Sequence, residues 1–472
     1  MDAMSRPPAS AVGVRRARRD ARGPRTVEVD VVVVGAGQAG LSTAYHLHRT
    51  GLVPVGSRGW EQARGTFVVL DDNARAGGAW QHRWRSLSMA DAHHVHDLPG
   101  MPLAVVDPAE AAADAVPYYF AQYEEAFGLN VQRPVSVVRV ERAPEGATAG
   151  GPTHRDEPRY LVTTRHVDHP DAVVVWSARG VVNASGTWQR PFWPAYPGRE
   201  TFRGRQLHTH DFRSAADLAD GHVVVVGGGT SAVQLLLQVA EVTTTTWVTR
   251  RPPRWVAADF TPELGREAVG RVDERVRAGL PPESVVSVTG LPLTPAYRAG
   301  ITSGVLRAHP VFTRILPDGV VWDGRAGRGS TGGGPARAGA GAGGSGGRPP
   351  GDGVGGDAVR SVGAARLGDP AVGGVEEAAV ETTAISVLGG WVDPPPFVAA
   401  RTILWATGFR AALEHLAPLG LRAPGGGIVM DGTEVVAEPR LQLVGYGPSA
   451  STVGANRAGR EAARRLRRHL GW

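Results

Sequence analysis

The chain has 472 residues, of which 42% are apolar and 20% are charged, so it has enough apolar material for a large buried core. It contains no cysteine, and every one of its 51 basic residues is arginine. These absences exclude a disulfide framework, a thiolate nucleophile, a thiolate zinc site, a lysine Schiff base and a P-loop lysine.

The formal net charge of +6 is concentrated at the two ends of the chain. Residues 1–25 hold seven arginines against two aspartates, and residues 457–468 hold six arginines against one glutamate. Basic ends can contact nucleic acid or an anionic surface, but no strip of alternating aromatic and basic residues accompanies these. We therefore expect solvated ends, a disordered basic tail over residues 1–26 and no nucleic-acid partner.

The N-terminal stretch lacks the features of a targeting or spanning segment. No apolar run follows its arginines before Val31, so a secretory signal is not expected. Nowhere do about 18 apolar residues run uninterrupted, so no membrane span is expected either. The sequence predicts a cytoplasmic protein.

An internal repeat organises the chain. Residues 31–47 (VVVVGAGQAGLSTAYHL) resemble residues 223–239 (VVVVGGGTSAVQLLLQV). Each copy is a β-branched run, a glycine-rich turn and a segment of helical period, which indicates a buried parallel strand followed by a helix. The sequence thus predicts an α/β fold with two Rossmann-like, three-layer dinucleotide-binding domains.

The first copy carries the G-x-G-x-x-G pattern as Gly35, Gly37 and Gly40. In that pattern the first glycine permits a tight turn, the second lets a pyrophosphate approach the backbone, and the third lets helix and strand pack. Gln38 and Ala39 fall at the start of the helix, where backbone amides face an anion. We predict a dinucleotide site here.

A carboxylate stands at the end of the next predicted strand, residues 67–72. Asp71 can accept hydrogen bonds from ribose hydroxyls, and its charge would repel a 2′-phosphate, so this site is predicted to hold an unphosphorylated adenosine. Asp71 lies 36 residues after Gly35, beyond the usual spacing of about 20, and the excess fits a loop over residues 56–65.

The second copy carries the G-x-G-x-x-A variant, and its next predicted strand, residues 243–251, ends in two arginines instead of a carboxylate. Guanidinium groups suit a phosphate, so this site is predicted to bind NADPH; the alternative is that the arginines are solvated surface residues. The residues assigned to this site are Gly227, Gly229, Thr230, Ser231, Ala232, Arg250 and Arg251.

Two dinucleotide units of opposite ribose chemistry indicate hydride transfer from NADPH to bound FAD. Here the chain resembles the flavin-containing monooxygenases, flavoproteins with two dinucleotide-binding domains. The family fingerprint F-x-G-x-x-x-H-x-x-x-(F/Y) stands as Phe202, Gly204, His208 and Phe212. The resemblance also covers a G-G-x-W element, which stands as Gly77, Gly78 and Trp80. Two linkers of the A-T-G type stand at Ala184 to Gly186 and at Ala406, Thr407 and Gly408, the second followed by Phe409. A C-terminal segment of the family stands at Gly445, Tyr446 and the helix after Ser451.

The resemblance implies that the NADPH domain is inserted in the FAD domain. Residues 27–190 and 400–472 would form the FAD-binding domain and residues 191–399 the NADPH-binding domain. Residues 311–316 and 319–322 predict a hairpin. The stretch from residue 324 to about 375 is so rich in glycine that a disordered loop is predicted.

Two kinds of histidine need separate interpretations. His208 of the fingerprint either assists catalysis or is a hydrogen-bonded linker residue. His93, His94 and His96, with His82 upstream, suggest metal ligands, but their spacing does not place them on one helix face, so no metal is predicted.

The resemblance implies that NADPH reduces FAD, that dioxygen then forms a flavin hydroperoxide, and that one oxygen atom passes to a small substrate. An amine or sulfide is favoured over a ketone, because the ketone-oxidising branch would have tryptophan in place of Phe212. The rival interpretations are an NADPH-dependent reductase that passes electrons to a quinone, metal or protein, and a nucleotide-sensing module without flavin. The oligomeric state stays open, with a homodimer as one candidate.

Overall fold

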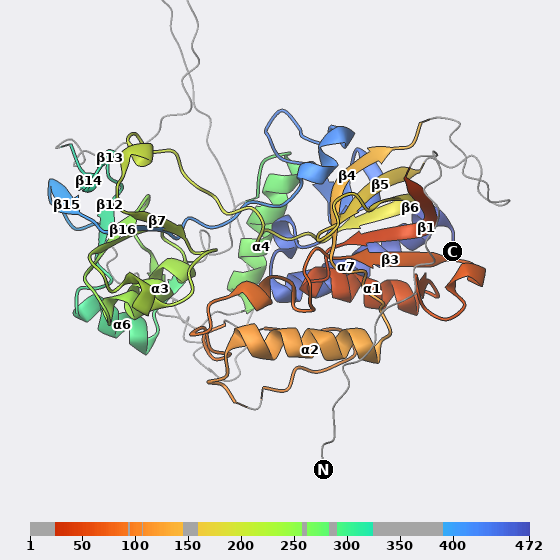
Figure 1. Cartoon of the computed structure of the whole chain (residues 1–472), viewed down its shortest axis with the longest axis horizontal. Helices are drawn as coiled ribbons and strands as arrows, with labels where there is room; N and C mark the ends of the chain where they lie inside the picture. The colour runs from red at the N-terminus through yellow and green to blue at the C-terminus, as the bar shows by residue number, and fades with distance from the viewer. Residues whose placement is uncertain are drawn as a thin grey trace, which may run out of the picture.

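The computed structural model describes residues 24–92, 95–105, 107–144, 159–256, 262–282, 290–323 and 390–472. They form two main sheets, the first mixed and the second parallel, that lie side by side with helices around them (Figure 1). The strands of the second sheet come from the middle of the chain, and both ends of the chain contribute to the first. This arrangement confirms the predicted α/β fold with two Rossmann-like units, one inserted in the other.

The first sheet has nine strands, and β1 lies between β3 and β6 with parallel pairing on both sides. Its strands are β1 (Arg25–Val34), β2 (Val53–Pro54), β3 (Thr66–Leu70), β4 (Val135–Arg142), β5 (Tyr160–His166), β6 (Val173–Asn183), β17 (Met430–Asp431), β18 (Glu434–Val435) and β19 (Glu438–Leu443). Val31 to Val34 are buried, as a continuous apolar run in a parallel sheet covered on both faces requires.

The second sheet has five parallel strands in the order β12-β9-β8-β16-β7. They are β7 (Arg205–His208), β8 (Val223–Val226), β9 (Thr245–Thr249), β12 (Ala308–Pro310) and β16 (Thr402–Trp405). Short strands β10 (Trp255–Val256) and β11 (Leu291–Pro292) pair beside it. The predicted hairpin is confirmed: β13 (Arg314–Leu316) and β14 (Gly319–Val321) pair antiparallel, and β15 (Phe397–Ala399) joins them.

Helices follow directly from the strands that carry the glycine turns. Helix α1 (Gln38–Arg49) comes after β1, and α3 (Thr230–Ala240) comes after β8, so the two copies of the sequence repeat form the same unit. The other helices are α2 (Ala112–Ala126), α4 (Pro262–Arg277), α6 (Pro295–Thr302) and α7 (Thr452–Leu470). None of the helices in the described part of the chain combines the length and apolar character needed to cross a membrane.

The structure differs from the expected boundaries at the start of β1, at β16 and at helix α4. Strand β1 begins at Arg25, inside the expected disordered tail, because it pairs with β6 from its first residue. Strand β16 pairs with β7 and β8, so the second sheet extends past residue 399. The glycine-rich stretch from residue 324 to about 375 lies outside the described residues.

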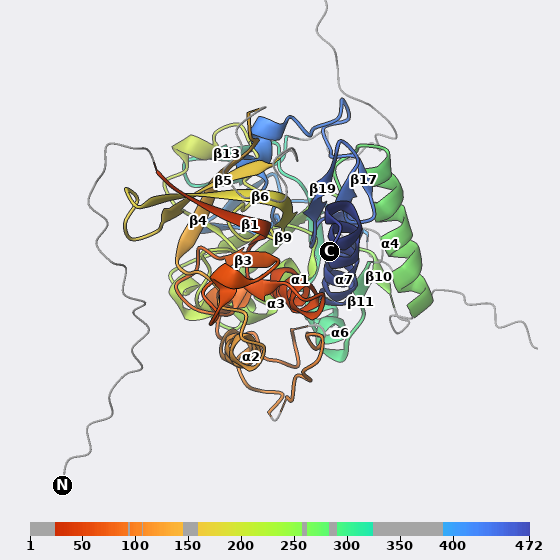
Figure 2. The same cartoon turned by 90° about the vertical axis from the view of Figure 1, so that its right-hand side faces the viewer.

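Helix α4 is the third difference, because it belongs to the middle of the chain yet contacts the first sheet (Figures 1 and 2). Val276 is fully buried, and a Cβ added at Gly447 would lie 3.0 Å from its Cγ1. Gly447 begins the 3₁₀ segment η6 (Gly447–Ser449), which lies between β19 and α7. The apolar face of α4 therefore packs on elements from the C-terminal part of the chain.

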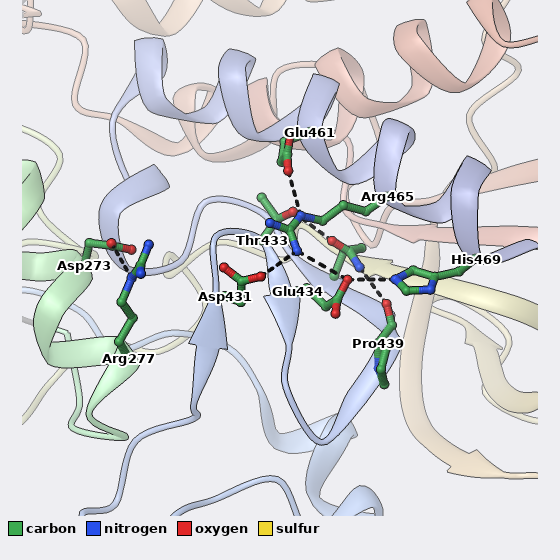
Figure 3. A network of polar contacts seen from close by, with 10 residues as sticks. Asp273, Arg277, Asp431, Thr433, Glu434, Pro439, Glu461, Arg465 and His469 are labelled. Atoms are coloured by element: carbon green, nitrogen blue, oxygen red, sulfur yellow. Dashed lines mark hydrogen bonds and ion pairs between the residues drawn. The ribbon is translucent and has the colours of Figure 1, made fainter.

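The basic C-terminal helix is held by ion pairs (Figure 3). Arg465 contacts Asp431 at 3.0 Å, Glu434 at 3.4 Å and Glu461 at 2.7 Å. His469 Nε2 lies 2.8 Å from Glu434 Oε2. This part of the C-terminal positive charge therefore holds α7 against β17 and β18 and is not simply exposed to solvent.

Candidate functional site

The first glycine loop is built by close backbone contacts. Gly35 has a φ of +97°, and a Cβ there would lie 2.5 Å from the Ala184 carbonyl oxygen. A Cβ at Gly40 would lie 1.8 Å from the Gly35 carbonyl oxygen. At Gly37, the residue that caps α1, a Cβ would meet nothing within 4 Å. Packing therefore requires the first and third glycines, and the second borders open space at a helix N-terminus.

Segments far apart in the sequence converge on this loop. A Cβ at Gly78 would lie 2.8 Å from Gly37 Cα, and a Cβ at Gly445 would lie 3.5 Å from Ala39 Cβ. Gln38 Nε2 donates to His96 O and to Asn456 Oδ1. The G-G-x-W element, whose Trp80 is half-buried, and the C-terminal turn thus both border the start of α1.

Asp71 lies directly beyond β3 and is 3% exposed. Its Oδ2 accepts a hydrogen bond from Ala36 N at 3.2 Å, so the carboxylate is held against the glycine loop. Its Oδ1 accepts from the backbone and side-chain nitrogens of Asn73. Arg133 lies 3.4 Å from Asp71 but pairs more closely with Glu124, at 2.6 Å.

The second glycine loop repeats the geometry of the first. Gly227 has a φ of +147°, and a Cβ there would lie 2.1 Å from the Ala406 carbonyl oxygen. At Gly229, which caps α3, a Cβ would meet nothing within 4 Å. Ala232 is fully buried, and Thr230 and Ser231 form the first turn of α3. The open position again lies at a helix N-terminus.

Arg250 and Arg251 follow the end of β9, and both are exposed. Neither side chain makes a hydrogen bond or ion pair within the described residues. Because β8 and β9 are parallel, these guanidinium groups lie at the same edge of the sheet as the second glycine loop. They are available there for an anion.

His208 is fully buried where the two units meet. Its Nε2 donates to Gly408 O at 3.1 Å, and its Nδ1 accepts from His210 N at 3.0 Å, which fixes one neutral tautomer. Burial lowers the pKa of His208 to about 4. Both ring nitrogens are used by backbone groups, which favours the linker interpretation over proton transfer. Thr407 Oγ1 likewise donates to Phe192 O and holds the second linker.

Arg83 is a residue of the site that the sequence analysis missed. Its guanidinium carbon lies 4.9 Å from the ring centre of Trp188, 5.8 Å from Trp80 and 5.9 Å from Trp84. Its buried Nε has no hydrogen-bond partner, and its guanidinium group forms no ion pair with any described residue. Burial lowers its pKa to about 10. The signal was an arginine between Trp80 and Trp84, directly after the G-G-x-W element.

Trp188 connects this arginine to both linkers. Its ring lies 5.1 Å from Phe409 in a stacked arrangement and 4.9 Å from His210. Trp84 also meets Phe212, the last fingerprint residue, edge to face at 6.0 Å. The fingerprint, the G-G-x-W element and the two linkers thus meet at one aromatic junction.

Of the histidines considered as metal ligands, His82 and His96 lie within the described residues. His82 Nε2 contacts Asn73 Oδ1, and no group of three or more histidine, aspartate or glutamate side chains suited to a metal occurs within the described residues. His93 and His94 lie outside them.

Comparisons with known proteins agree with this geometry. Residues 32–277 match the family model described as pyridine nucleotide-disulphide oxidoreductase. A flavin-containing monooxygenase structure from Stenotrophomonas maltophilia is 29% identical, with a TM-score of 0.62 over 94% of this chain and 99% of that one. The bacillithiol disulfide reductase Bdr from Bacillus cereus shares the fold at 13% identity, with a TM-score of 0.56 over 94% of this chain and 100% of that one.

A curated relative, the uncharacterized oxidoreductase CzcO of Bacillus velezensis, is 24% identical over 212 residues, which are 45% of this chain and 52% of the relative. The chain spans about half the length of the curated relatives that it matches first.

We predict opposite outcomes for alanine at two glycines of the first loop. Gly40→Ala should lower the free energy of unfolding by about 3 kcal/mol or more, because its Cβ overlaps a backbone carbonyl. Gly37→Ala should change it by less than about 1 kcal/mol but reduce the flavin retained on purification, since its methyl group enters the open space. Thermal unfolding and the ratio of flavin to protein absorbance measure both effects. Equal losses of stability would contradict the assignment.

We predict a stability loss in acid that depends on His208. Its folded pKa of about 4 lies below the unfolded value of 6.5, so the unfolded chain binds more protons between these values. The contribution of the neutral ring to the free energy of unfolding is fully present above pH 6.5 and is lost as the pH falls toward 4. From pH 7.5 to 5 the loss from this residue is about 2 kcal/mol.

The variant His208→Gln keeps a donor for Gly408 O without titrating. It should therefore lose less stability than the wild type over the same pH change, as measured by urea unfolding at both pH values. His48→Gln, at an exposed position of α1, is the control and should behave as the wild type. An unchanged pH slope in His208→Gln would show that the ring is not held neutral.

Proposed function

This chain belongs to the pyridine nucleotide-disulphide oxidoreductase family, and on that premise we propose that it is an FAD-dependent, NADPH-using monooxygenase. The family uses FAD and a pyridine nucleotide. The proposed substrate is a small nucleophile that receives one oxygen atom from dioxygen at nitrogen or sulfur. One observation carries the proposal: two open helix N-termini of the same construction, one beside a carboxylate and the other beside two unpaired arginines.

The first loop fits FAD. The open position at Gly37 and the amides at the start of α1 suit the pyrophosphate, and Asp71 suits the ribose if a hydroxyl replaces its contact with the Asn73 side chain. Gly78, Trp80 and Gly445 would border the rest of the cofactor. When bound, flavin would supply hydride acceptance and the activation of dioxygen.

The second loop fits NADPH. Gly229 leaves space for a pyrophosphate, and Thr230 and Ser231 would offer their amides to it from the first turn of α3. Arg250 and Arg251 would bind the 2′-phosphate. A guanidinium group suits this role because it stays charged and offers several donors.

The aromatic junction would exclude water from the reacting centre. Trp188, Phe409 and Phe212 supply apolar surface, and His208 holds Gly408 in place. In that setting Arg83 would hold positive charge with no anion of the protein to neutralise it. Its field would favour a negative charge on a bound partner, because electrostatic interactions are stronger where water is excluded.

Oxygenation at nitrogen or sulfur is proposed over ketone oxidation because the fingerprint ends in Phe212. The likeness to the Stenotrophomonas maltophilia flavin-containing monooxygenase supports the oxygenase over a reductase, since it has 29% identity over 94% of this chain, whereas the disulfide reductase Bdr has 13% identity over the same share. The chain also lacks cysteine, so no thiol of its own can enter disulfide exchange.

Stopped-flow absorbance tests the proposed function. The flavin-loaded protein is reduced with one equivalent of NADPH and mixed with oxygenated buffer. We expect a long-lived transient in the near ultraviolet before the spectrum of oxidised flavin returns. A direct return to that spectrum would favour a reductase that serves a quinone, metal or protein acceptor. Failure of NADPH to reduce the flavin would contradict both functions.

We predict that the double variant Arg250→Ala and Arg251→Ala discriminates between the two nicotinamide cofactors. It should raise the KM for NADPH at least tenfold and change the KM for NADH less than threefold, because only NADPH carries the phosphate that these side chains bind. Steady-state oxidation of each cofactor gives both constants. Arg254→Ala, an exposed residue on the same loop, is the control. Equal changes for NADPH and NADH would rule out the assignment.

A further inference from the structure

Trp391 is the one exposed tryptophan of the twelve in the chain, with 41% of its surface accessible. Its indole Nε1 donates a hydrogen bond to Thr249 Oγ1 at 2.9 Å. The indole therefore has a satisfied polar group and an uncovered apolar surface, which is an arrangement suited to a planar ligand.

Thr249 places this indole beside the second glycine loop. It is the last residue of β9 and is 1% exposed. Its Cγ2 lies 3.8 Å from the position that a Cβ on Gly228 would take. Arg250 follows it directly. Trp391 thus lies at the same strand end as the two arginines and the glycine loop.

The backbone around Trp391 is fixed to the edge of the second sheet. Val392 N donates to Ala308 O at 2.8 Å, and His309 Nδ1 lies 3.1 Å from Val392 O. Ala308 and His309 belong to β12, the edge strand next to β9. These two contacts hold the backbone next to Trp391 at the edge of the sheet. The indole extends from there toward the end of β9.

We propose that Trp391 is an adenine-binding residue of the pyridine-nucleotide site. The purine ring lies on the indole, and the neighbouring arginines bind the phosphate on the adjoining ribose. The segment that precedes β15 thereby supplies part of the affinity for the cofactor. This inference rests on the proposed function, because it assigns a residue to the same nucleotide site. Stacking on an aromatic side chain binds any purine, so the contribution of Trp391 is independent of the 2′-phosphate.

Isothermal titration calorimetry on the flavin-loaded protein tests the inference with 2′,5′-ADP and 5′-ADP. Trp391→Ala should weaken the binding of both nucleotides about tenfold. Trp391→Phe, which keeps an aromatic ring, should weaken it less than threefold. Thr249→Val removes the hydrogen bond to the indole and should give an intermediate loss. Val392→Ala, at the adjacent exposed position, is the matched control and should bind as the wild type.

A second readout separates stacking from loss of structure. Reduced nicotinamide mononucleotide lacks the adenosine, so its KM for flavin reduction should be the same in Trp391→Ala and the wild type. Unchanged or tighter binding of both ADP nucleotides by Trp391→Ala would overturn the inference and leave the proposed function intact. A wild-type protein that binds neither nucleotide would overturn both.

Discussion

The construction of the site depends on one backbone contact that occurs twice. Ala184 N donates to Val34 O and Ala406 N donates to Val226 O, so each linker continues the hydrogen bonding of the strand that carries a glycine loop. The carbonyl oxygen of each of these alanines then occupies the space that a Cβ on Gly35 or Gly227 would need. Because both linkers run between the two units, the same contacts shape the loops and set where the units meet.

Arg83 is a residue of the aromatic junction that lowers the stability of the fold. A partly buried guanidinium with an unpaired Nε lowers stability, and its contacts with three tryptophans offset only part of that cost. The fully buried His208 is satisfied at both ring nitrogens, so it does not share this feature. Unsatisfied groups of this kind concentrate at functional sites, which agrees with an arginine reserved for a bound anion.

The sequence predicted the parts of the fold that short-range rules govern. The two strand–turn–helix units follow from β-branched runs and from glycines whose neighbours leave no room for a side chain. Other features depend on contacts between distant segments, which no local pattern encodes. These are the packing of Val276 against η6, the pairing of β16 in the second sheet and the contacts of Arg83 with Trp188. Trp391 and Thr249 are likewise 142 residues apart. The roles of Asp71, Arg250 and Arg251 stay predictions that their positions in the fold suit.

The packing of α4 ties a helix from the middle of the chain to the first unit. The helix lies between the two sheets (Figure 1), and its Val276 packs on η6 of the first unit. A displacement of α4 away from η6 would expose this fully buried side chain to water. Small sliding displacements keep such side chains covered, as in shear motions of packed helices. A movement of α4 against the first unit would then proceed by sliding along η6, with Val276 kept covered.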